Sequence, residues 1–294
     1  MFDNVMIGID GEQGGRDAIA LARQLVSDEG KLTLVHVHSG FPIVAKGSGA
    51  NSPFVITERE RAEELLAEES RNAGLEASFT SIGSSSIGQG LHQLAERDGA
   101  DLLVVGSTRR GLFGRVLLGD DTRAALNGAP CSVAVAPAGY AEYAKPLQHV
   151  GVAFDDSPES HYALTVAREL GAYFGAKLSA CDVVAARAYY LGVCGPERGL
   201  DDELAEQFEP GLLDGVEFHA RYGLPADELG FYSGSVDLLV TGSRGYGPIG
   251  RIVHGSTSAQ LTRTARCPLL VLVRNGAAET PTGAVDDGEV AIKA

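Results

Sequence analysis

Short runs of Val, Leu and Ile alternate along the chain with amphipathic stretches whose apolar residues recur three and four positions apart. In the first half, the apolar runs predict strands near 4–10, 31–37, 76–82, 101–106 and 132–136. The amphipathic stretches predict helices near 13–27, 57–73, 87–97 and 119–127. Continuous apolar runs are typical of strands that are buried on both faces. Their alternation with helices therefore predicts a parallel sheet with right-handed crossovers.

The same pattern occurs a second time, which makes the chain a tandem repeat. The stretch VMIGIDGEQGGRDAIALARQL near the start matches VGVAFDDSPESHYALTVAREL after the midpoint, and each apolar run ends in an aspartate, Asp10 or Asp155. Later segments match in the same order: KLTLVHV with KLSACDV, DLLVVGS with DLLVTGS, and CSVAVA with CPLLVL. We therefore predict two α/β domains at 1–138 and 148–275, a linker at 139–147 and a disordered tail at 276–294.

Composition and charge narrow the possible partners. The 294 residues suffice for two cores, and the net charge of −15 argues against nucleic acid and against an anionic membrane surface as partners. The four cysteines form no CxxC pair, so neither a disulfide framework nor a metal site is indicated. No apolar run approaches the roughly 18 residues of a membrane span, and the N-terminus lacks the basic region of a signal peptide. We therefore expect a cytoplasmic protein.

The segment at 242–258, GSRGYGPIGRIVHGSTS, carries the most functional information because it joins a predicted strand to a predicted helix. Gly242 and Gly245 allow positive φ and let backbone N–H groups come close to a ligand. The hydroxyls and unpaired N–H groups of 255–258 stand at a helix N-terminus, where an anion is favoured. With Arg244 and Arg251 adding positive charge, the segment predicts a phosphate cradle. A turn followed by a helix N-cap is the structural alternative.

Residues 245–250 also read GYGPIG, which matches the dinucleotide fingerprint GxGxxG. That fingerprint needs an acidic residue roughly twenty positions later to hold the ribose. No Asp or Glu occurs between 251 and 278, and the first copy has RRGLFG at the equivalent positions. We therefore reject a dinucleotide site.

The spacing Gly-x-x-Gly, nine residues, Gly-Ser at 242–256 resembles the nucleotide-binding signature of the universal stress protein family, and the resemblance covers both repeats. It implies two tandem Rossmann-like domains, each a five-stranded parallel sheet of order 3-2-1-4-5 flanked by helices. It also implies ATP, with or without Mg²⁺, as ligand. For the second copy the resemblance assigns adenosine contacts to Ala153, Phe154, Asp155 and Val183. It assigns phosphate contacts to Gly242, Gly245, Gly255, Ser256, Thr257 and Ser258, beside Arg244.

The first copy departs from this signature. Its degenerate equivalent site consists of Asp10, Val37, Gly106, Arg109, Gly119 and Asp120. Arg109 replaces the second glycine, and Asp120 replaces the serine, so that a carboxylate occupies the place of a phosphate and repels it. We therefore predict that the second copy binds nucleotide better. The first copy is either empty, or uses Asp120 as an internal phosphate mimic, or recruits a nucleotide through Arg109 and Arg110.

Three functions are compatible with these patterns. The first is a nucleotide-binding regulatory module of a stress response, in which the ligand biases the shape of 40–57 or 186–215 and a partner reads the change. The second is a ligand-free structural or interaction protein. The third is a slow ATPase with His254 beside the phosphate loop, although nothing supplies the positioned base that efficient phosphoryl transfer requires.

The closing strands of the two copies, 133–136 and 269–273, bear on assembly. We expect them at sheet edges, where an exposed apolar strand is normally covered. The family resemblance implies that such edges pair antiparallel, which would join the two copies within one chain. A homodimer of that unit is a further possibility.

Overall fold

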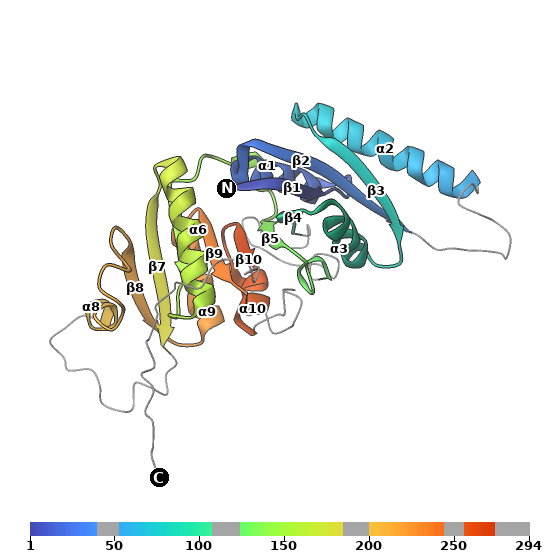
Figure 1. Ribbon diagram of the computed structural model, residues 1–294. Helices are drawn as coiled ribbons and strands as arrows, with labels where there is room; N and C mark the ends of the chain where they lie inside the picture. Colours follow the sequence, from blue (N-terminus) through green and yellow to red (C-terminus); the bar gives the residue numbers. More distant parts are fainter. Residues whose placement is uncertain (40–52, 108–123, 185–199, 244–255, 274–294) are drawn as a thin grey trace, which may run out of the picture.

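The computed structural model of the chain describes residues 1–39, 53–107, 124–184, 200–243 and 256–273. Strands and helices alternate through both halves (Figure 1). The first half contains β1 (Phe2–Gly8), α1 (Gln13–Leu25), β2 (Val26–Ser39), α2 (Pro53–Ala73), β3 (Ser78–Ser84), α3 (Ile87–Asp98), β4 (Leu102–Gly106) and β5 (Ser132–Ala136). The second half contains β6 (His149–Ala153), α6 (Pro158–Phe174), β7 (Lys177–Val184), α8 (Leu200–Ala205), β8 (Glu217–Tyr222), α9 (Pro225–Tyr232), β9 (Leu238–Gly242), α10 (Ser256–Thr264) and β10 (Leu269–Leu272).

All ten strands belong to one sheet, in the order β3-β2-β1-β4-β5-β10-β9-β6-β7-β8. Each half has parallel neighbours, as the sequence pattern predicted, and keeps the order 3-2-1-4-5 that the family resemblance implied. The two halves differ from two separate five-stranded sheets because β5 and β10 pair antiparallel, with Leu270 opposite Ala134. Each closing strand therefore lies at the edge of its own five-stranded half, as predicted, and the antiparallel pair that the family resemblance implied places both at the centre of the ten-stranded sheet. Its edges are β3 and β8.

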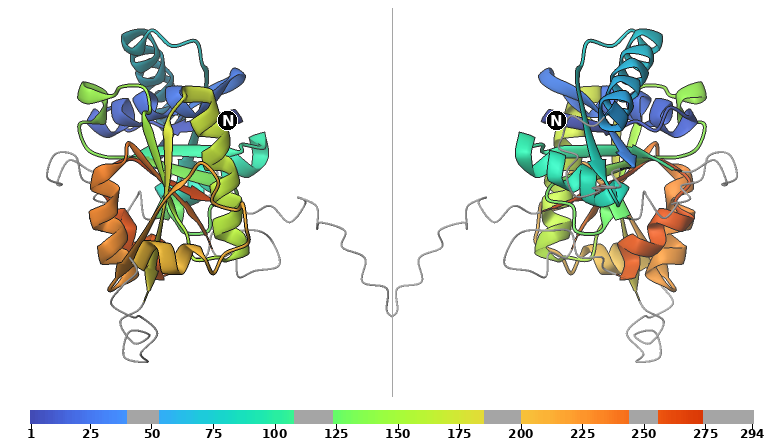
Figure 2. Two further views of the ribbon diagram at one scale, coloured as in Figure 1. Left: turned by 90° about the vertical axis from the view of Figure 1, so that its left-hand side faces the viewer. Right: turned by 90° about the vertical axis from the view of Figure 1, so that its right-hand side faces the viewer.

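The sheet is buried on both faces, and each face has its own core. On β1, Val5 and Ile7 join a cluster with apolar residues of α1, α2 and α6, whereas Met6 joins a cluster with residues of α3, α9 and α10. This alternation follows from the period of two along a strand. The chain therefore forms three layers, with helices on both faces of the sheet (Figure 2).

Local signals in the sequence begin and end the helices. Ser157 caps α6, its hydroxyl oxygen accepting from Ser160 N, and Pro158 stands in the first turn. Gly99 and Gly175 end α3 and α6 in the left-handed conformation, with φ of 64° and 62°. None of the described helices is long and apolar enough to cross a membrane.

The predicted linker is an ordered part of the fold. It contains the short helix α5 (Tyr140–Tyr143), which packs on α1. The buried carboxylate of Asp17 accepts hydrogen bonds from Gly139 N (2.8 Å) and Ala141 N (2.9 Å), and Tyr140 OH accepts one from Gln24 Nε2 (2.7 Å). These contacts fix the start of the connection between the two halves.

Most predicted elements differ from the observed ones only at their ends. β2 is longer than predicted because it begins at Val26, directly after α1. Of the helix predicted at 119–127, the structure describes 124–127; residues 124–126 are helical and Asn127 lies in a turn. The predicted irregular segment 186–215 includes α8, and the predicted tail lies outside the described residues.

Candidate functional site

A cavity of about 380 Å³ opens in the second half, at the carboxyl ends of β6, β7 and β9. Such ends are where parallel α/β sheets bind ligands, because the helix N-termini and strand-end loops meet there. The cavity brings together six residues that the sequence assigned to nucleotide contacts: Ala153, Phe154, Asp155, Val183, Gly242 and Thr257. Its walls also include Ser157, Glu159, Ser160, Cys181, Asp182, Pro225 and Leu229.

The rest of the predicted signature lies outside the described residues. This holds for Arg244, Gly245 and Gly255, for the side chains of Ser256 and Ser258, and for Arg109, Gly119 and Asp120 of the first copy. The predicted difference between the two glycine loops, and therefore between their phosphate affinities, stays a prediction.

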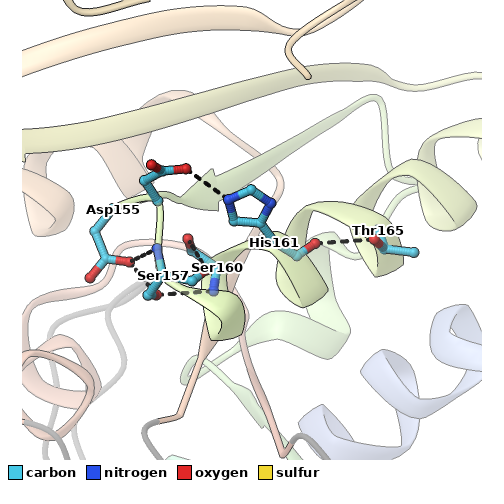
Figure 3. Close-up of polar contacts among 6 residues, drawn as sticks. Asp155, Ser157, Ser160, His161 and Thr165 are labelled. Atoms are coloured by element: carbon cyan, nitrogen blue, oxygen red, sulfur yellow. Dashed lines mark hydrogen bonds and ion pairs between the residues drawn. The ribbon is translucent and has the colours of Figure 1, made fainter. Parts of the chain in front are cut away.

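Asp155 orders the turn between β6 and α6. Its Oδ1 accepts from the Ser157 hydroxyl (2.5 Å) and from Ser157 N (3.3 Å), and the same hydroxyl oxygen accepts from Ser160 N (3.2 Å) (Figure 3). The carboxylate is exposed and forms part of the cavity wall. Asp155 therefore has a structural task at the helix start as well as a position at the candidate site.

The next residue, Asp156, adopts a left-handed backbone with φ of 59°, which few residues other than glycine do. Its Oδ1 lies 2.8 Å from His161 Nε2, one turn into α6 (Figure 3). The His161 ring packs at 5.4 Å from the ring of Phe154, whose other neighbour is Phe208 at 5.2 Å. These contacts fix Phe154, which belongs to the cavity wall, against the start of α6.

The first copy repeats the turn with different residues. Asp10 Oδ1 accepts from Glu12 N (2.9 Å) and Gly15 N (3.1 Å), and Gly11 takes the left-handed position with φ of 78°. A cavity of about 260 Å³ lies there and is called the first cavity, whereas the cavity of the second copy is called the second cavity. Three predicted residues line the first cavity: Asp10, Val37 and Gly106. On its wall, His36 Nδ1 lies 2.8 Å from the carbonyl oxygen of Ile9.

The two strand-end glycines have a role that the sequence reading missed. Gly242 and Gly106 are not among the described glycines with positive φ, so the predicted reason for Gly242 is wrong. A Cβ on Gly242 would lie 2.6 Å from the Glu159 carbonyl oxygen, and one on Gly106 would lie 2.1 Å from that of Gly14. The missing Cβ therefore lets the end of β9 contact the backbone of the first turn of α6. It likewise lets the end of β4 contact the backbone of the first turn of α1.

Asp182 is a carboxyl group with a raised pKa on the wall of the second cavity. Burial raises the pKa of this half-buried side chain, and the nearby charges of Asp155 and Asp156 raise it further, against a hydrogen bond from Val183 N that lowers it. A carboxylate in such a place disfavours a second negative charge and favours an N–H donor or a cation.

A buried hydroxyl follows each strand-end glycine. Ser107 and Ser243 are 3% and 2% exposed, and the Oγ of each has no hydrogen-bond partner among the described residues. Ser107 lines the cavity of the first copy. An unpaired buried hydroxyl is costly, so Ser107 Oγ is available to a polar group that enters this cavity.

Sequence reasoning also missed Glu159 and Asp182 as cavity residues. An alignment of the two copies could have found them. In that alignment Glu159 is equivalent to Gly14, and Asp182 is equivalent to His36. The structure supports the second match, because Ile9 N donates to Val35 O (2.8 Å) just as Phe154 N donates to Cys181 O (3.0 Å).

The described walls of the larger cavity suit a flat, partly apolar ligand. Val183, Pro225 and Leu229 supply apolar surface, and Thr257 belongs to the first turn of α10. No Lys or Arg occurs among the described lining residues of either cavity. Within the described residues, no three His, Cys, Asp or Glu side chains are grouped to hold a metal ion.

Comparison with known proteins gives the same family in sequence and in fold. A mycobacterial relative, universal stress protein Rv2005c of Mycobacterium tuberculosis, is 30% identical over 189 residues, which is 58% of this chain and 61% of that protein. Universal stress protein Rv2319c is 25% identical over 240 residues, 72% of this chain and 80% of that protein. The chain thus spans about three fifths of the length of the first of these relatives.

Solved structures agree on the fold. A universal stress protein from Archaeoglobus fulgidus matches with a TM-score of 0.65 at 19% identity, over 92% of this chain and 98% of that one. A solved structure of a protein from Pseudomonas aeruginosa matches with a TM-score of 0.58 at 16% identity, over 92% of this chain and 93% of that one. The model of the universal stress protein family matches residues 1–137 and again 146–274. The chain therefore belongs to the universal stress protein family, in a tandem form with two copies of the domain.

Proposed function

We propose that this protein binds an adenine nucleotide in the cavity of its second half and acts as a regulatory module of a stress response. The observation that carries the proposal is the convergence of Ala153, Phe154, Asp155, Val183, Gly242 and Thr257 on one cavity at the strand ends. These residues come from β6, β7, β9 and α10 and are distant in the sequence. Such convergence supports a ligand site more strongly than any one motif does.

ATP fits these residues in part. The apolar walls suit an adenine ring, and the N-terminus of the nine-residue helix α10 favours a phosphate through its unpaired N–H groups. In this proposal Gly245, Gly255, Ser256 and Ser258 would complete the phosphate contacts, with Arg244 beside them. The carboxylates of Asp155, Glu159 and Asp182 oppose a bare triphosphate, so bound Mg²⁺ would assist by lowering the charge of the ligand.

We further propose that binding is not followed by efficient hydrolysis. Phosphoryl transfer depends on cationic groups that neutralise charge on the transferred group. The described walls of the cavity offer carboxylates where such cations are needed. The nucleotide would then act by its occupancy, and slow hydrolysis would be incidental.

The antiparallel pair of β5 and β10 supports a second part of the proposal. We propose that domains 1–138 and 148–275 act as one intramolecular pair. Homodimerisation of that pair would have to use other surfaces, and sedimentation velocity of the purified chain would reveal it.

Calorimetric titration of ATP with Mg²⁺ into the stripped full chain tests the proposed function. We expect micromolar binding near one site per chain. Gly245→Arg with Ser256→Asp copies the first-copy residues into the second loop and should abolish it. The reciprocal variant, Arg109→Gly with Asp120→Ser, is the matched control and should retain binding at the second copy. Absence of heat and of copurified nucleotide would favour the alternative, a ligand-free interaction protein.

A further inference from the structure

The two cavities of this chain differ in charge at equivalent positions. The backbone hydrogen bonds from Ile9 to Val35 and from Phe154 to Cys181 place Asp182 where the first copy has His36. The contacts of the strand-end glycines likewise identify equivalent positions at the start of the helix. Gly106 lies against the Gly14 carbonyl, and Gly242 lies against the Glu159 carbonyl. Glu159 therefore stands where the first copy has Gly14.

These two exchanges change the walls of the cavities. The second cavity is lined by three carboxylates, Asp155, Glu159 and Asp182, whereas the first is lined by one, Asp10. Asp10 and Asp155 are equivalent and both order the turn before a helix. The difference of two charges thus comes from Glu159 and Asp182.

The charged residues among the described lining of the second cavity are all acidic. Neither Glu159 nor Asp182 is fully exposed, and the described lining residues include no Lys or Arg. In such a place each like charge within about 8 Å of a bound phosphate weakens its binding by roughly tenfold or more at an effective dielectric constant of about 20. A neutral ligand of the same shape is not affected in this way.

We infer that Glu159 and Asp182 make the second cavity select its ligand by charge, admitting a nucleoside, a monophosphate or a magnesium-complexed nucleotide in preference to a free triphosphate. The inference rests on the proposed function, and it names the class of ligand that the site takes. Asp182 and Glu159 are specificity-determining residues in this account. The described walls of the first cavity, with His36 and Gly14, lack this selection.

Calorimetry with four ligands tests the inference: adenosine, AMP, ATP with EDTA, and ATP with Mg²⁺, each titrated into the stripped full chain. We expect the natural chain to bind adenosine and AMP at least about tenfold more tightly than metal-free ATP. The isosteric variant Asp182→Asn with Glu159→Gln removes two such charges, so it should strengthen the binding of metal-free ATP by about a hundredfold and leave that of adenosine within about twofold.

The matched control is Glu209→Gln with Asp214→Asn, which removes the same charge from two exposed residues outside the cavity wall. It should leave all four affinities unchanged, and thermal melting checks that both variants are folded. If the natural chain binds metal-free ATP as tightly as adenosine, or if the cavity variant strengthens adenosine and ATP equally, the inference is wrong while the proposed function stands. If no ligand binds to any folded variant, both are overturned.

Discussion

Replacement of Asp17 by alanine should loosen the connection between the two halves. The Asp17 side chain is 1% exposed, and its two oxygens accept from Gly139 N at 2.8 Å, Ala141 N at 2.9 Å and Gln13 Nε2 at 3.2 Å. Two of these donors belong to the start of the linker, 122 and 124 residues away in the sequence. Asp17→Ala leaves both backbone N–H groups without their acceptor.

The magnitude follows from two opposing effects. Hydrogen bonds to a charged acceptor contribute about 1.5–3 kcal/mol each, so the two backbone bonds together stabilise the fold by roughly 3–6 kcal/mol. Burial of the carboxylate offsets part of this stabilisation. Burial also affects the Asp17 pKa more than the hydrogen bonds do, so the pKa is raised although the hydrogen bonds lower it. We therefore expect Asp17→Ala to lower the free energy of unfolding by about 2 kcal/mol.

The pKa shift also sets the pH dependence. Because the folded-state pKa of Asp17 is raised above its unfolded value, the folded chain binds this proton more tightly. The stability that Asp17 contributes is therefore fully present below the unfolded pKa and decreases as pH rises through the folded pKa. The cost of Asp17→Asn, which cannot titrate, should accordingly be smaller at pH 7.5 than at pH 4.5.

Urea unfolding followed by circular dichroism measures both effects, with Glu64→Gln as a control that alters an exposed carboxylate on α2. Limited proteolysis should cut the Asp17→Ala chain within 139–147 faster than the natural chain. The reasoning is refuted if Asp17→Ala costs less than about 0.5 kcal/mol, or if the cost of Asp17→Asn grows as pH rises.

Three further substitutions probe other contacts. Gly242→Ala places a Cβ 2.6 Å from the Glu159 carbonyl oxygen. It should therefore destabilise the second half by about 1–3 kcal/mol and weaken nucleotide binding. An unchanged melting temperature would contradict this prediction. Leu270→Asp buries an unpaired charge opposite Ala134, where β5 and β10 pair, and should lower the free energy of unfolding by several kcal/mol. Urea unfolding measures this loss, and small-angle scattering would detect separated halves. A compact chain of natural stability would contradict the prediction. Ser179→Ala removes a buried hydroxyl that lies 2.7 Å from His149 Nε2 and 2.5 Å from Tyr232 OH. It should lower the free energy of unfolding by about 2 kcal/mol, more than Tyr232→Phe, because the serine hydroxyl contacts both partners. Equal costs of the two substitutions in urea unfolding would contradict this.

The repeat and the strand alternation were enough to predict most of the architecture. Buried parallel strands such as DLLVVGS and DLLVTGS carry their own signal, because every residue of β4 and β9 up to the final glycine is buried and apolar or nearly so. The place of Asp155 and Gly242 at one cavity follows from the same topology. The carboxyl ends of neighbouring parallel strands meet at one edge whatever the side chains are.

Contacts that span long sequence distances could not be predicted in this way. The sequence predicted a linker at 139–147 but not its contacts, and Asp17 and Gln24 of α1 hold its start in place. An aspartate on the apolar face of a helix is locally unfavourable, and only the packed structure supplies its partners. The close contact of Gly242 with Glu159 was missed for the same reason, since local backbone preference suggested positive φ and tertiary packing required a missing Cβ.

The acidic walls of the second cavity show a different limit. Cys181 and Val183 pack into one core and Asp182 lies between them, so alternation alone places Asp182 on the other side of β7, but it does not say that a cavity opens there. A motif comparison ranks the two copies by their glycine loops and favours the second. The described cavity walls rank the two copies by charge. Because Glu159 and Asp182 add negative charge to the second cavity, the walls favour binding of an anion in the first copy. Because both features act on the same bound phosphates, the affinity of each copy depends on the balance of loop and wall, and the four-ligand titration separates the two contributions.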